Sequence, residues 1–581
     1  MEQNSRALKI VILFIFIIVG ISIFLLAVLK IIIEDRRLPR LVIEEKNRAI
    51  RGSIISQDGY QIAYSNKLYE VAVDTRCIDP KKKELFVNLF SIYSGVDKKS
   101  VKKALRRRGY VVLSYKLDTK RAYQLKILSR KFYQMNMFIP YRIGKNYYKQ
   151  GLTITESGEK RKYPYKDILT PVVGYVQKSR IKRINYIYPK SIKGIEKYYD
   201  KYLKPQQNGV IRGKRDIGNN IILNKKALIK KRIDGYNVHL NVNLLLQKNL
   251  ENILDSHKKD LEAREIIAAV MESSTGKLIA IATSNRYNPE RIKDLSALNP
   301  KFIEYSFEPG SVIKPITFAL LLEHKLVSPM EVIRGYNGRY KLGRKVITDE
   351  HRFDWLSAEN VIVHSSNIGI AQLAQRLPYN KFYNGLKSFG FGQRTGIDLP
   401  YEKRGSIVSM YKLKSEIYKA TVGYGYSIRV TFMQLLKAYN VFNNEGFALS
   451  PKIASFLTRP NGKRKDINFP KPKKVVSSKT ASIMRDILKK VVQKGTGTVA
   501  KIEGLEIGGK TGTAHMVKRG KYVRKYNSSF FGFANDKKHR YTIGVTVIEP
   551  KLRHFASQTA VPVFREIVME LVNEGYLSLD N

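Results

Sequence analysis

The amino-acid sequence predicts an α+β protein with three parts: a helix that spans a membrane, an N-terminal domain, and a C-terminal antiparallel sheet flanked by helices. Two observations support this class. Twenty uncharged residues, 10–29, lie between Lys9 and Lys30, which is long enough to cross a bilayer. Short alternating apolar runs in the C-terminal half end at turn residues, as strands do. The 581 residues leave room for two or more domains.

The chain is strongly basic, with 105 Lys and Arg against 49 Asp and Glu and a formal net charge of +56. Such an excess is compatible with nucleic-acid binding. The basic residues are, however, spread through the whole chain and mixed with Ile, Tyr and Asn instead of forming one patch. We therefore expect a solvated basic surface and no nucleic-acid partner, with attraction to anionic lipid or wall polymer as an alternative.

Cys77 is the only cysteine, so no disulfide within the chain and no multi-cysteine metal site can form. The eight histidines lack the close pairing typical of metal ligands. We expect no metal site, and Cys77 is interpreted as a packing residue.

Residues 10–31 are expected to form an uncleaved membrane anchor after a tail of residues 1–9. A signal peptide would have a shorter apolar region and a small-x-small cleavage site, which does not follow Leu29. Basic residues flank the span on both sides, so the charge rule leaves the orientation open. They are Arg6 and Lys9 before the span, and Lys30, Arg36, Arg37 and Arg40 after it.

The N-terminal domain is expected over residues 32–235. Asp58-Gly59 between two alternating apolar stretches predicts a hairpin turn. Residues 120–131 have helical spacing, and residues 204–220, where Gln, Asn, Gly and Arg cluster, are interpreted as an exposed loop. No motif with recognisable chemistry lies between residues 79 and 145.

The C-terminal domain is expected over residues 236–581. Alternating or continuous apolar runs predict its strands, and helical spacing predicts two helices. The strands are expected at 238–242, 266–271, 277–282, 528–534 and 541–548, and the helices at 244–254 and 560–571. The pair 266–271 and 277–282 reads as a hairpin that leads towards a candidate nucleophile.

Ser311 and Lys314 form the first candidate catalytic motif. Three residues apart on a helix, they share one face, so the amine can reach the hydroxyl. Burial of the lysine would lower its pKa and make it a base that activates the serine. The spacing alone is not specific, because it recurs in this lysine-rich chain at Ser100/Lys103, Ser157/Lys160, Ser179/Lys182, Ser256/Lys259 and Ser409/Lys412.

Two further motifs follow Ser311. Ser365-Ser366-Asn367 lies where one helix, capped near Ser357, gives way to another beginning at Ile368. Lys510-Thr511-Gly512-Thr513 is flanked by small residues that would let a substrate backbone approach closely. Taken singly, Ser311 would be a helix cap, Ser365-Ser366-Asn367 a turn, and the Lys-Thr-Gly run a surface turn.

Together, in the order Ser-x-x-Lys, Ser-x-Asn, Lys-Thr-Gly, the three motifs resemble those of penicillin-binding proteins. The chain is similar to the class B members, which are peptidoglycan transpeptidases, over about residues 45 to 575. Residues 56 and 57 depart from the family pattern, with Ser-Gln where Asp-Arg is usual. Further matching stretches begin at Arg51-Gly52, Arg161, Gly174-Tyr175, Gly194-Ile195-Glu196, Gly423-Tyr424-Gly425 and Phe530-Phe531-Gly532.

The resemblance implies a penicillin-binding transpeptidase domain with a β-lactamase-like fold, an N-terminal pedestal, and a role for each motif residue. Ser311 is the expected nucleophile and Lys314 its base, Ser365 relays a proton, and Asn367 orients the substrate amide. Lys510, Thr511, Gly512 and Thr513 hold the substrate and its carboxylate, while the backbone N–H groups of Ser311 and Thr513 form the oxyanion hole. The reaction cross-links stem peptides through a serine acyl-enzyme, releases D-alanine, and needs no cofactor.

The resemblance is stronger to the division branch of the family, through Glu308 before Pro309 and the stretch Arg215-Asp216-x-Gly218-Asn219. It implies a single-pass protein of the bacterial inner membrane, with the N-terminus inside and the catalytic domain in the extracytoplasmic space. The implied partners are stem peptides on lipid-linked precursor polymer, β-lactams, a membrane-embedded glycosyltransferase and other division proteins. Alternatives are an elongation-type transpeptidase, a D,D-carboxypeptidase or β-lactamase-like hydrolase, and a non-catalytic division scaffold.

Pro315, directly after Lys314, gives one local prediction. A proline here removes the N–H that would bond the carbonyl of Ser311 and crowds that carbonyl. We therefore expect the first turn at the nucleophile to depart from an ideal α-helix.

Overall fold

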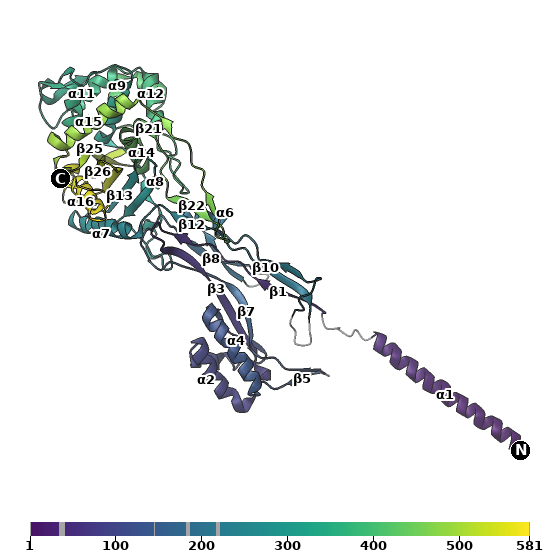
Figure 1. Ribbon diagram of the computed structural model, residues 1–581. Coiled ribbons are helices and arrows are strands. Elements are labelled where there is room, and N and C mark those ends of the chain that lie inside the picture. The colour runs from purple at the N-terminus through teal and green to yellow at the C-terminus, as the bar shows by residue number, and fades with distance from the viewer. Residues whose placement is uncertain (1, 34–40, 145, 182–185, 216–220, 580–581) are drawn as a thin grey trace. The chain divides into compact units, whose positions relative to one another are not determined.

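The computed structural model describes residues 2–33, 41–144, 146–181, 186–215 and 221–579 (Figure 1). It divides into two compact units, which we describe separately. The first comprises residues 1–48 and 208–232, and the second comprises residues 49–207 and 233–581.

The first unit contains the long N-terminal helix α1 (Glu2–Ile33) and a small antiparallel sheet. Residues 7–33 of α1 have a mean hydropathy of 3.3 and are long and apolar enough to cross a membrane. This agrees with the predicted span at 10–31. The sheet has the order β1-β10-β11, formed by β1 (Val42–Asn47), β10 (Gly209–Lys214) and β11 (Leu228–Lys230).

The predicted loop at 204–220 is wrong in its middle part, because β10 lies there. Its backbone pairs with β1 on one side and β11 on the other, so strand hydrogen bonds outweigh the loop-like composition. Residues 216–220, which carry part of the Arg215-Asp216-x-Gly218-Asn219 stretch, lie outside the described residues.

The second unit begins with a large mixed sheet of order β23-β22-β12-β2-β3-β7-β9-β8, with β4 paired to β3. The predicted hairpin turn at Asp58-Gly59 is confirmed: Ser56 N–H donates to Tyr60 O at 2.9 Å, and Gly59 has a φ of +86°. The strands are β2 (Ile54–Ile55), β3 (Gln61–Asp74), β4 (Tyr110–Leu117), β7 (Thr153–Lys162), β8 (Val176–Ile181), β9 (Tyr186–Ser191), β12 (Asn237–Leu240), β22 (Ala454–Thr458) and β23 (Arg464–Asp466).

Strand β12 confirms the predicted strand after residue 236, and it pairs parallel with β2 and antiparallel with β22. This sheet therefore takes strands from both sides of the proposed domain boundary, which stays a prediction.

Three helices pack together beside β3 and β4: α2 (Lys83–Ser94), α3 (Lys98–Ala104) and α4 (Thr119–Gln134). Their shared core is aromatic, with Phe86, Phe90 and Phe132 fully buried. Helix α4 confirms the predicted helix at 120–131 and begins at an Asp118 cap, whose carboxylate accepts the N–H of Arg121. A short hairpin of β5 (Tyr141–Ile143) and β6 (Asn146–Tyr148) follows.

A buried charge network joins the stretches of this region that carry the family resemblance. Glu196 accepts from the Nε atoms of Arg51 and Arg161 at 2.8 and 2.7 Å, and Arg51 also contacts Asp200 at 2.6 Å. Arg161 further donates to the backbone O of Gly52. Burial alone would raise the pKa of Glu196, but the two guanidinium groups lower it overall. Glu196 lies on α5 (Gly194–Tyr198), and Asp200 begins α6 (Asp200–Leu203).

The predicted antiparallel sheet of the C-terminal half is confirmed, with the order β14-β13-β27-β26-β25. One face packs against α7 (Leu244–Asp260) and α16 (Ala560–Asn573), which confirm the helices predicted at 244–254 and 560–571. The strands are β13 (Glu265–Glu272), β14 (Leu278–Thr283), β25 (Glu506–Lys518), β26 (Lys521–Asn535) and β27 (Arg540–Ile548).

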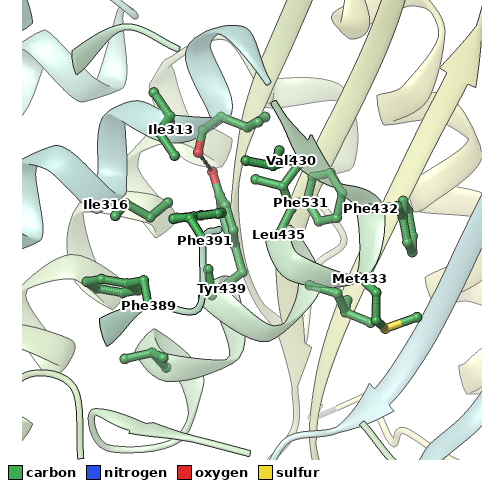
Figure 2. Packing of buried hydrophobic residues seen from close by; sticks show 14 of the residues in the cluster. Ile313, Ile316, Phe389, Phe391, Val430, Phe432, Met433, Leu435, Tyr439 and Phe531 are labelled. Carbon is green, nitrogen blue, oxygen red and sulfur yellow. Dashed lines mark hydrogen bonds between the residues drawn. The ribbon is translucent and has the colours of Figure 1, made fainter. Parts of the chain in front are cut away.

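The opposite face of this sheet packs against a second layer of helices centred on α14 (Phe432–Asn443). Phe531 of β26 lies against Phe432 and Tyr439 of α14, and Ile313 and Ile316 complete this part of the core (Figure 2). The other helices of the layer are α8 (Lys301–Glu304), α9 (Lys314–Glu323), α10 (Ala358–Val363), α11 (Asn367–Gln375), α12 (Tyr379–Ser388), α13 (Glu416–Gly423) and α15 (Ser478–Lys494).

Short paired strands connect these helices. They are β15 (Ser306–Phe307) with β20 (Val430–Thr431), β16 (Val332–Arg334) with β19 (Trp355–Ser357), β17 (Arg339–Leu342) with β18 (Lys345–Thr348), and β21 (Phe447–Ala448) with β24 (Lys473–Lys474).

Candidate active site

Ser311 lies on a single 3₁₀ turn, Gly310–Ile313, that leads directly into helix α9. The backbone N–H of Lys314 donates to the carbonyl of Ser311, which is the tighter i to i+3 pattern. Pro315 has no N–H for the α-helical bond to the same carbonyl. The predicted departure from an ideal helix at the nucleophile is therefore confirmed.

Contacts from other elements hold this turn in place. The hydroxyl of Tyr439 on α14 donates to the backbone O of Val312 at 2.7 Å (Figure 2). Gly310 N–H donates to Gly425 O at 3.0 Å. Gly425 has a φ of +96°, and a Cβ there would lie 2.0 Å from Gly310 O. Only glycine fits this close approach, so the turn and the Gly425 loop are packed backbone against backbone.

Lys314 is fully buried, as the prediction of a base in an apolar setting requires. Its amine donates to the carbonyl and, at 3.2 Å, to the hydroxyl of Ser365. Among the described contacts, the amine bonds Ser365 and not Ser311. Burial lowers the pKa of Lys314 to about 7, against the opposing influence of the Asp349 and Glu350 charges. A large fraction of the amine is therefore uncharged at neutral pH.

Ser365 and Asn367 occupy the predicted junction between two helices. Ser357 caps α10 and Ser366 caps α11 through their side chains. Ser365 between them has a φ of +62°, an uncommon conformation for a residue other than glycine. This backbone conformation is sparsely populated, so the surrounding contacts must hold it.

Asp349 holds the residues that follow Ser365, and it was not among the residues predicted from the sequence. One of its carboxylate oxygens accepts the N–H groups of Asn367 at 2.6 Å and Ile368 at 3.0 Å, and the other accepts the Ser366 hydroxyl. A carboxylate at a helix N-terminus also interacts favourably with the helix dipole. Asn367 donates from its amide to Thr348 O at 3.0 Å. Asp349 thus positions Ser366 and Asn367 at the start of α11, directly after Ser365.

Lys510 lies on β25 and is fully buried. Its amine donates to the hydroxyl of Thr511 at 3.2 Å and to that of Thr496 at 3.4 Å. Burial, and then the nearby charge of Lys314, hold the pKa of Lys510 well below its usual value. The two lysines therefore share one electrostatic environment.

Gly512 and Ala514 lie on one face of β25, as strand alternation predicts. A Cβ on Gly512 would lie 2.8 Å from Val312 Cγ1, and one on Gly310 would lie 3.2 Å from the Ala514 Cβ. The small side chains at Gly512 and Ala514 therefore leave room for the turn that carries Ser311. Close approach of a substrate backbone to these residues stays a prediction, and Gly512 lines the cavity that contains Ser311.

The predicted residues converge on one cavity of about 390 Å³. Ser311, Ser365 and Asn367 line one part of its wall, and residues 511–513 line another. Lys314 and Lys510 lie buried behind them. The lining also includes Glu350, His351, His364, Thr496 and Phe555, none of which belongs to a motif that the sequence indicated.

A second cavity of about 430 Å³ shares Asn367 with the first. Its wall combines Lys345 and Thr348 of β18 with Tyr424, Tyr426 and Tyr522, among others. The ring of Tyr426 contacts those of Tyr424 and Tyr522 at centroid distances of 6.0 and 5.9 Å. Asn367 therefore belongs to the walls of both cavities, and the second wall is rich in tyrosine.

Two family models match this chain. The model for the penicillin-binding protein transpeptidase domain matches residues 266–569, and the model for the penicillin-binding protein dimerisation domain matches residues 46–240. The first covers more than half of the chain and lies inside the expected C-terminal domain of residues 236–581, whereas the second extends past residue 235, the expected end of the pedestal.

Curated relatives carry related names. The chain is 30% identical to penicillin-binding protein PbpB of Mycobacterium tuberculosis over 58% of its length and 52% of the relative. It is 26% identical to the peptidoglycan D,D-transpeptidase FtsI of Buchnera aphidicola over 90% of its length and 86% of the relative. For stage V sporulation protein D of Bacillus subtilis these values are 27%, 90% and 78%. The chain thus spans about half the length of its mycobacterial relatives.

Solved structures share the fold. Penicillin-binding protein 2X of Streptococcus thermophilus matches 92% of this chain and 81% of its own, with a TM-score of 0.76 and 21% identity. Penicillin-binding protein 3 of Mycobacterium tuberculosis, complexed with aztreonam, matches 92% of this chain and 98% of its own, with a TM-score of 0.65 and 23% identity. These likenesses confirm the predicted fold class.

Proposed function

The chain belongs to the class B penicillin-binding proteins, and from this premise we propose that it is a peptidoglycan D,D-transpeptidase. It cross-links stem peptides through an acyl-enzyme on Ser311 and releases D-alanine. The observation that carries the proposal is the single cavity lined by Ser311, Ser365, Asn367 and residues 511–513, with two buried lysines of lowered pKa behind it.

Acylation begins when Ser311 attacks the carbonyl between the two terminal D-alanines. Lys314 accepts the hydroxyl proton because about half of an amine with a pKa of about 7 is uncharged at neutral pH. We expect the amine to move from Ser365 towards Ser311 when substrate fills the cavity, since catalytic hydrogen bonds tighten in the substrate complex. Ser365, already bonded to Lys314, relays the proton to the leaving D-alanine amine.

Charge that develops in this step is stabilised by groups on the turn and on β25. The backbone N–H groups of Ser311 and Thr513 serve as the oxyanion hole, a contribution of about 3 kcal/mol for one donor in comparable sites. The hydroxyls of Thr511 and Thr513, with the positive character of Lys510, bind the terminal carboxylate. Asn367 orients the substrate amide. An amine of a second stem peptide then attacks the ester and completes the cross-link.

β-Lactams are expected to acylate Ser311, because they occupy the place of the acyl-D-alanyl-D-alanine end. A structurally similar penicillin-binding protein 3 binds aztreonam in the solved complex. For this chain, the fit of β-lactams to the same cavity is part of the proposal.

The proposed place of action is the division septum. Glu308, the feature that favours the division branch, accepts the backbone N–H of Ser427 at 2.8 Å beside the nucleophile turn. Relatives include proteins named FtsI and stage V sporulation protein D. We propose that α1 anchors the chain in the inner membrane with the N-terminus inside, where a membrane glycosyltransferase and other division proteins are partners. A fluorescent fusion along the lateral wall would favour the elongation branch instead.

The test uses the purified full-length protein with a peptide ending in D-Ala-D-Ala and an amine acceptor. The proposal expects release of D-alanine together with a cross-linked product, and loss of both in Ser311→Ala. Release of D-alanine without cross-linking at saturating acceptor would identify a carboxypeptidase. Full rescue of cell division by Ser311→Ala would identify a non-catalytic scaffold.

A further inference from the structure

One part of the catalytic cavity is lined by groups that the acylation step does not use. Glu350 and His351 lie in the loop between β18 and β19, and His364 follows the end of α10. Glu350 acts electrostatically on both Lys314 and Lys510, so it lies near both buried lysines. In the described part of the chain, its carboxylate has no ion-pair partner.

Glu350 is not needed to build the site. Its neighbour Asp349 makes the hydrogen bonds that position the Ser365–Asn367 turn. Glu350 adds a negative charge to the cavity and lies exposed at its edge.

The negative charge of Glu350 disfavours binding of the acyl donor and favours binding of the acyl acceptor. The acyl donor ends in a carboxylate, which Glu350 repels. The acyl acceptor brings an amine, which is protonated at neutral pH because an ordinary alkyl amine has a pKa of about 10. A carboxylate in the same cavity wall as Ser311 therefore complements the acceptor and not the donor.

We propose that Glu350 binds the ammonium group of the acceptor in the catalytic cavity, and that His364 takes the proton that this group must lose before it attacks. This deepens the proposed transpeptidase function and rests on it. An ammonium ion has no free electron pair, so one proton must leave before the nitrogen can react.

His364 is suited to receive that proton because it is neutral at physiological pH. Burial, and then the neighbouring His351, Lys494 and Lys510, lower its pKa. Its ring also packs against Phe353 at a centroid distance of 5.2 Å, which orients it. The titratable groups that act on His364 are His351, Lys494 and Lys510, and Glu350 and Ser311 share the cavity wall with it.

In the transfer step, the acceptor nitrogen loses two protons and gains the bond to the acyl carbon. The first proton of the ammonium group goes to His364 and from there to solvent. The nitrogen electron pair forms the new amide bond to the acyl carbon, and the ester bond between that carbon and Ser311 Oγ breaks. The second proton of the nitrogen passes to Ser311 Oγ through Lys314, so the serine hydroxyl is restored.

The test is Glu350→Gln in the full-length protein, with Asp354→Asn as the matched control. Asp354 is an exposed acid on the same loop, but it does not line the cavity. For Glu350→Gln we expect a KM for an amine acceptor raised about tenfold, the loss of one hydrogen bond to a charged group. Acylation by a fluorescent penicillin should be no slower than in wild type, because Glu350 repels the carboxylate of the donor and raises the pKa of Lys314. Asp354→Asn should match wild type in both.

A second, uncharged acceptor distinguishes a loss of cation binding from a general loss of transfer activity. Hydroxylamine is uncharged at neutral pH, so Glu350→Gln should accept it as well as wild type does. An unchanged KM for the amine acceptor, or equal losses with both acceptors, would overturn the proposal for Glu350.

The role of His364 is tested by measuring the rate of transfer at two pH values. In His364→Gln, transfer to an amine acceptor should fall at pH 7 and recover towards wild type at pH 9, where more of the acceptor is already free amine. A loss that does not depend on pH would overturn its role. Failure of wild type to form any penicillin adduct would instead refute the underlying function.

Discussion

At the scale of single residues, the burial of Lys314 lowers its pKa and so allows it to act as a base. Its folded pKa of about 7 lies below the ordinary lysine value, so the uncharged base is present above pH 7 and is lost as the pH falls through that value. We expect the second-order rate constant for acylation by a fluorescent penicillin to fall about tenfold per pH unit below pH 7 and to level off above it.

Because Lys510 interacts with Lys314, the apparent pKa of this pH–rate profile belongs to the two lysines together. Lys314→Arg provides the control, since arginine keeps the charge but does not titrate in this range. It should be inactive at every pH tested. A rate that is flat between pH 5.5 and pH 9 in wild type would show that Lys314 is not the base.

Asp349 is the residue whose removal should damage the site without unfolding the domain. In Asp349→Asn the side-chain amide cannot accept the Ser366 hydroxyl, and the negative charge at the N-terminus of α11 is lost. We expect acylation to slow about tenfold or more, since hydrogen bonds of charged groups are worth about 1.5–3 kcal/mol. Thermal unfolding should change by only a few degrees. Unchanged acylation would show that Ser365 and Asn367 are held by other contacts.

At the scale of elements, the nucleophile turn depends on backbone contact with the Gly425 loop. Gly425→Ala would place a methyl group 2.0 Å from Gly310 O at a positive φ, so the turn must shift. We expect loss of penicillin labelling and a lower melting temperature. Gly462→Ala is the matched control, because Gly462 has a φ of +80° but nothing within 4 Å of the added carbon. Similar effects of both substitutions would mean that the close approach is unimportant.

Local patterns were sufficient for much of the catalytic half. The strands predicted at 266–271, 528–534 and 541–548 are confirmed because each is apolar, is rich in strand-forming residues and ends at turn residues. The departure from an ideal α-helix at Ser311 was predictable from Pro315 alone, although its 3₁₀ form was not. The motif residues also gather as expected, since order and spacing were sufficient to identify them.

Features that depend on distant partners were not predictable in this way. Strand β10 looks like a loop in sequence, and only pairing with β1 and β11 makes it a strand. Asp349 and Glu350 lie in a loop outside every motif, and their roles come from α11 and the buried lysines. An acidic pair in an otherwise basic stretch was the one available signal.

At the scale of the whole molecule, the buried network around Glu196 holds together segments far apart in the chain. Two arginines bond this one carboxylate, so Glu196→Ala removes the ion pair of Arg161 and leaves Arg51 paired with Asp200. Breaking a buried pair typically costs about 3–5 kcal/mol. We expect a melting temperature at pH 7 that is several degrees lower than in wild type.

The contribution of Glu196 to stability decreases as the pH falls. The folded pKa of Glu196 is lowered, so its stabilising contribution is present above the unfolded value and is lost as the pH falls through the folded one. The difference in melting temperature between wild type and Glu196→Ala should therefore shrink on acidification. A difference that grows towards low pH would contradict this account of the network. Glu44→Gln, at an exposed pair with Lys46, should change little at any pH.

The central claim is that Ser311 is the nucleophile of a penicillin-sensitive transpeptidase. Its most direct test is mass spectrometry of the full-length protein after incubation with benzylpenicillin, followed by peptide mapping. We predict one adduct of the mass of the opened antibiotic on the peptide that contains Ser311, persistent on the timescale of the preparation and absent in Ser311→Ala. An adduct on another residue, rapid loss by hydrolysis, or no adduct on the folded protein would contradict the account.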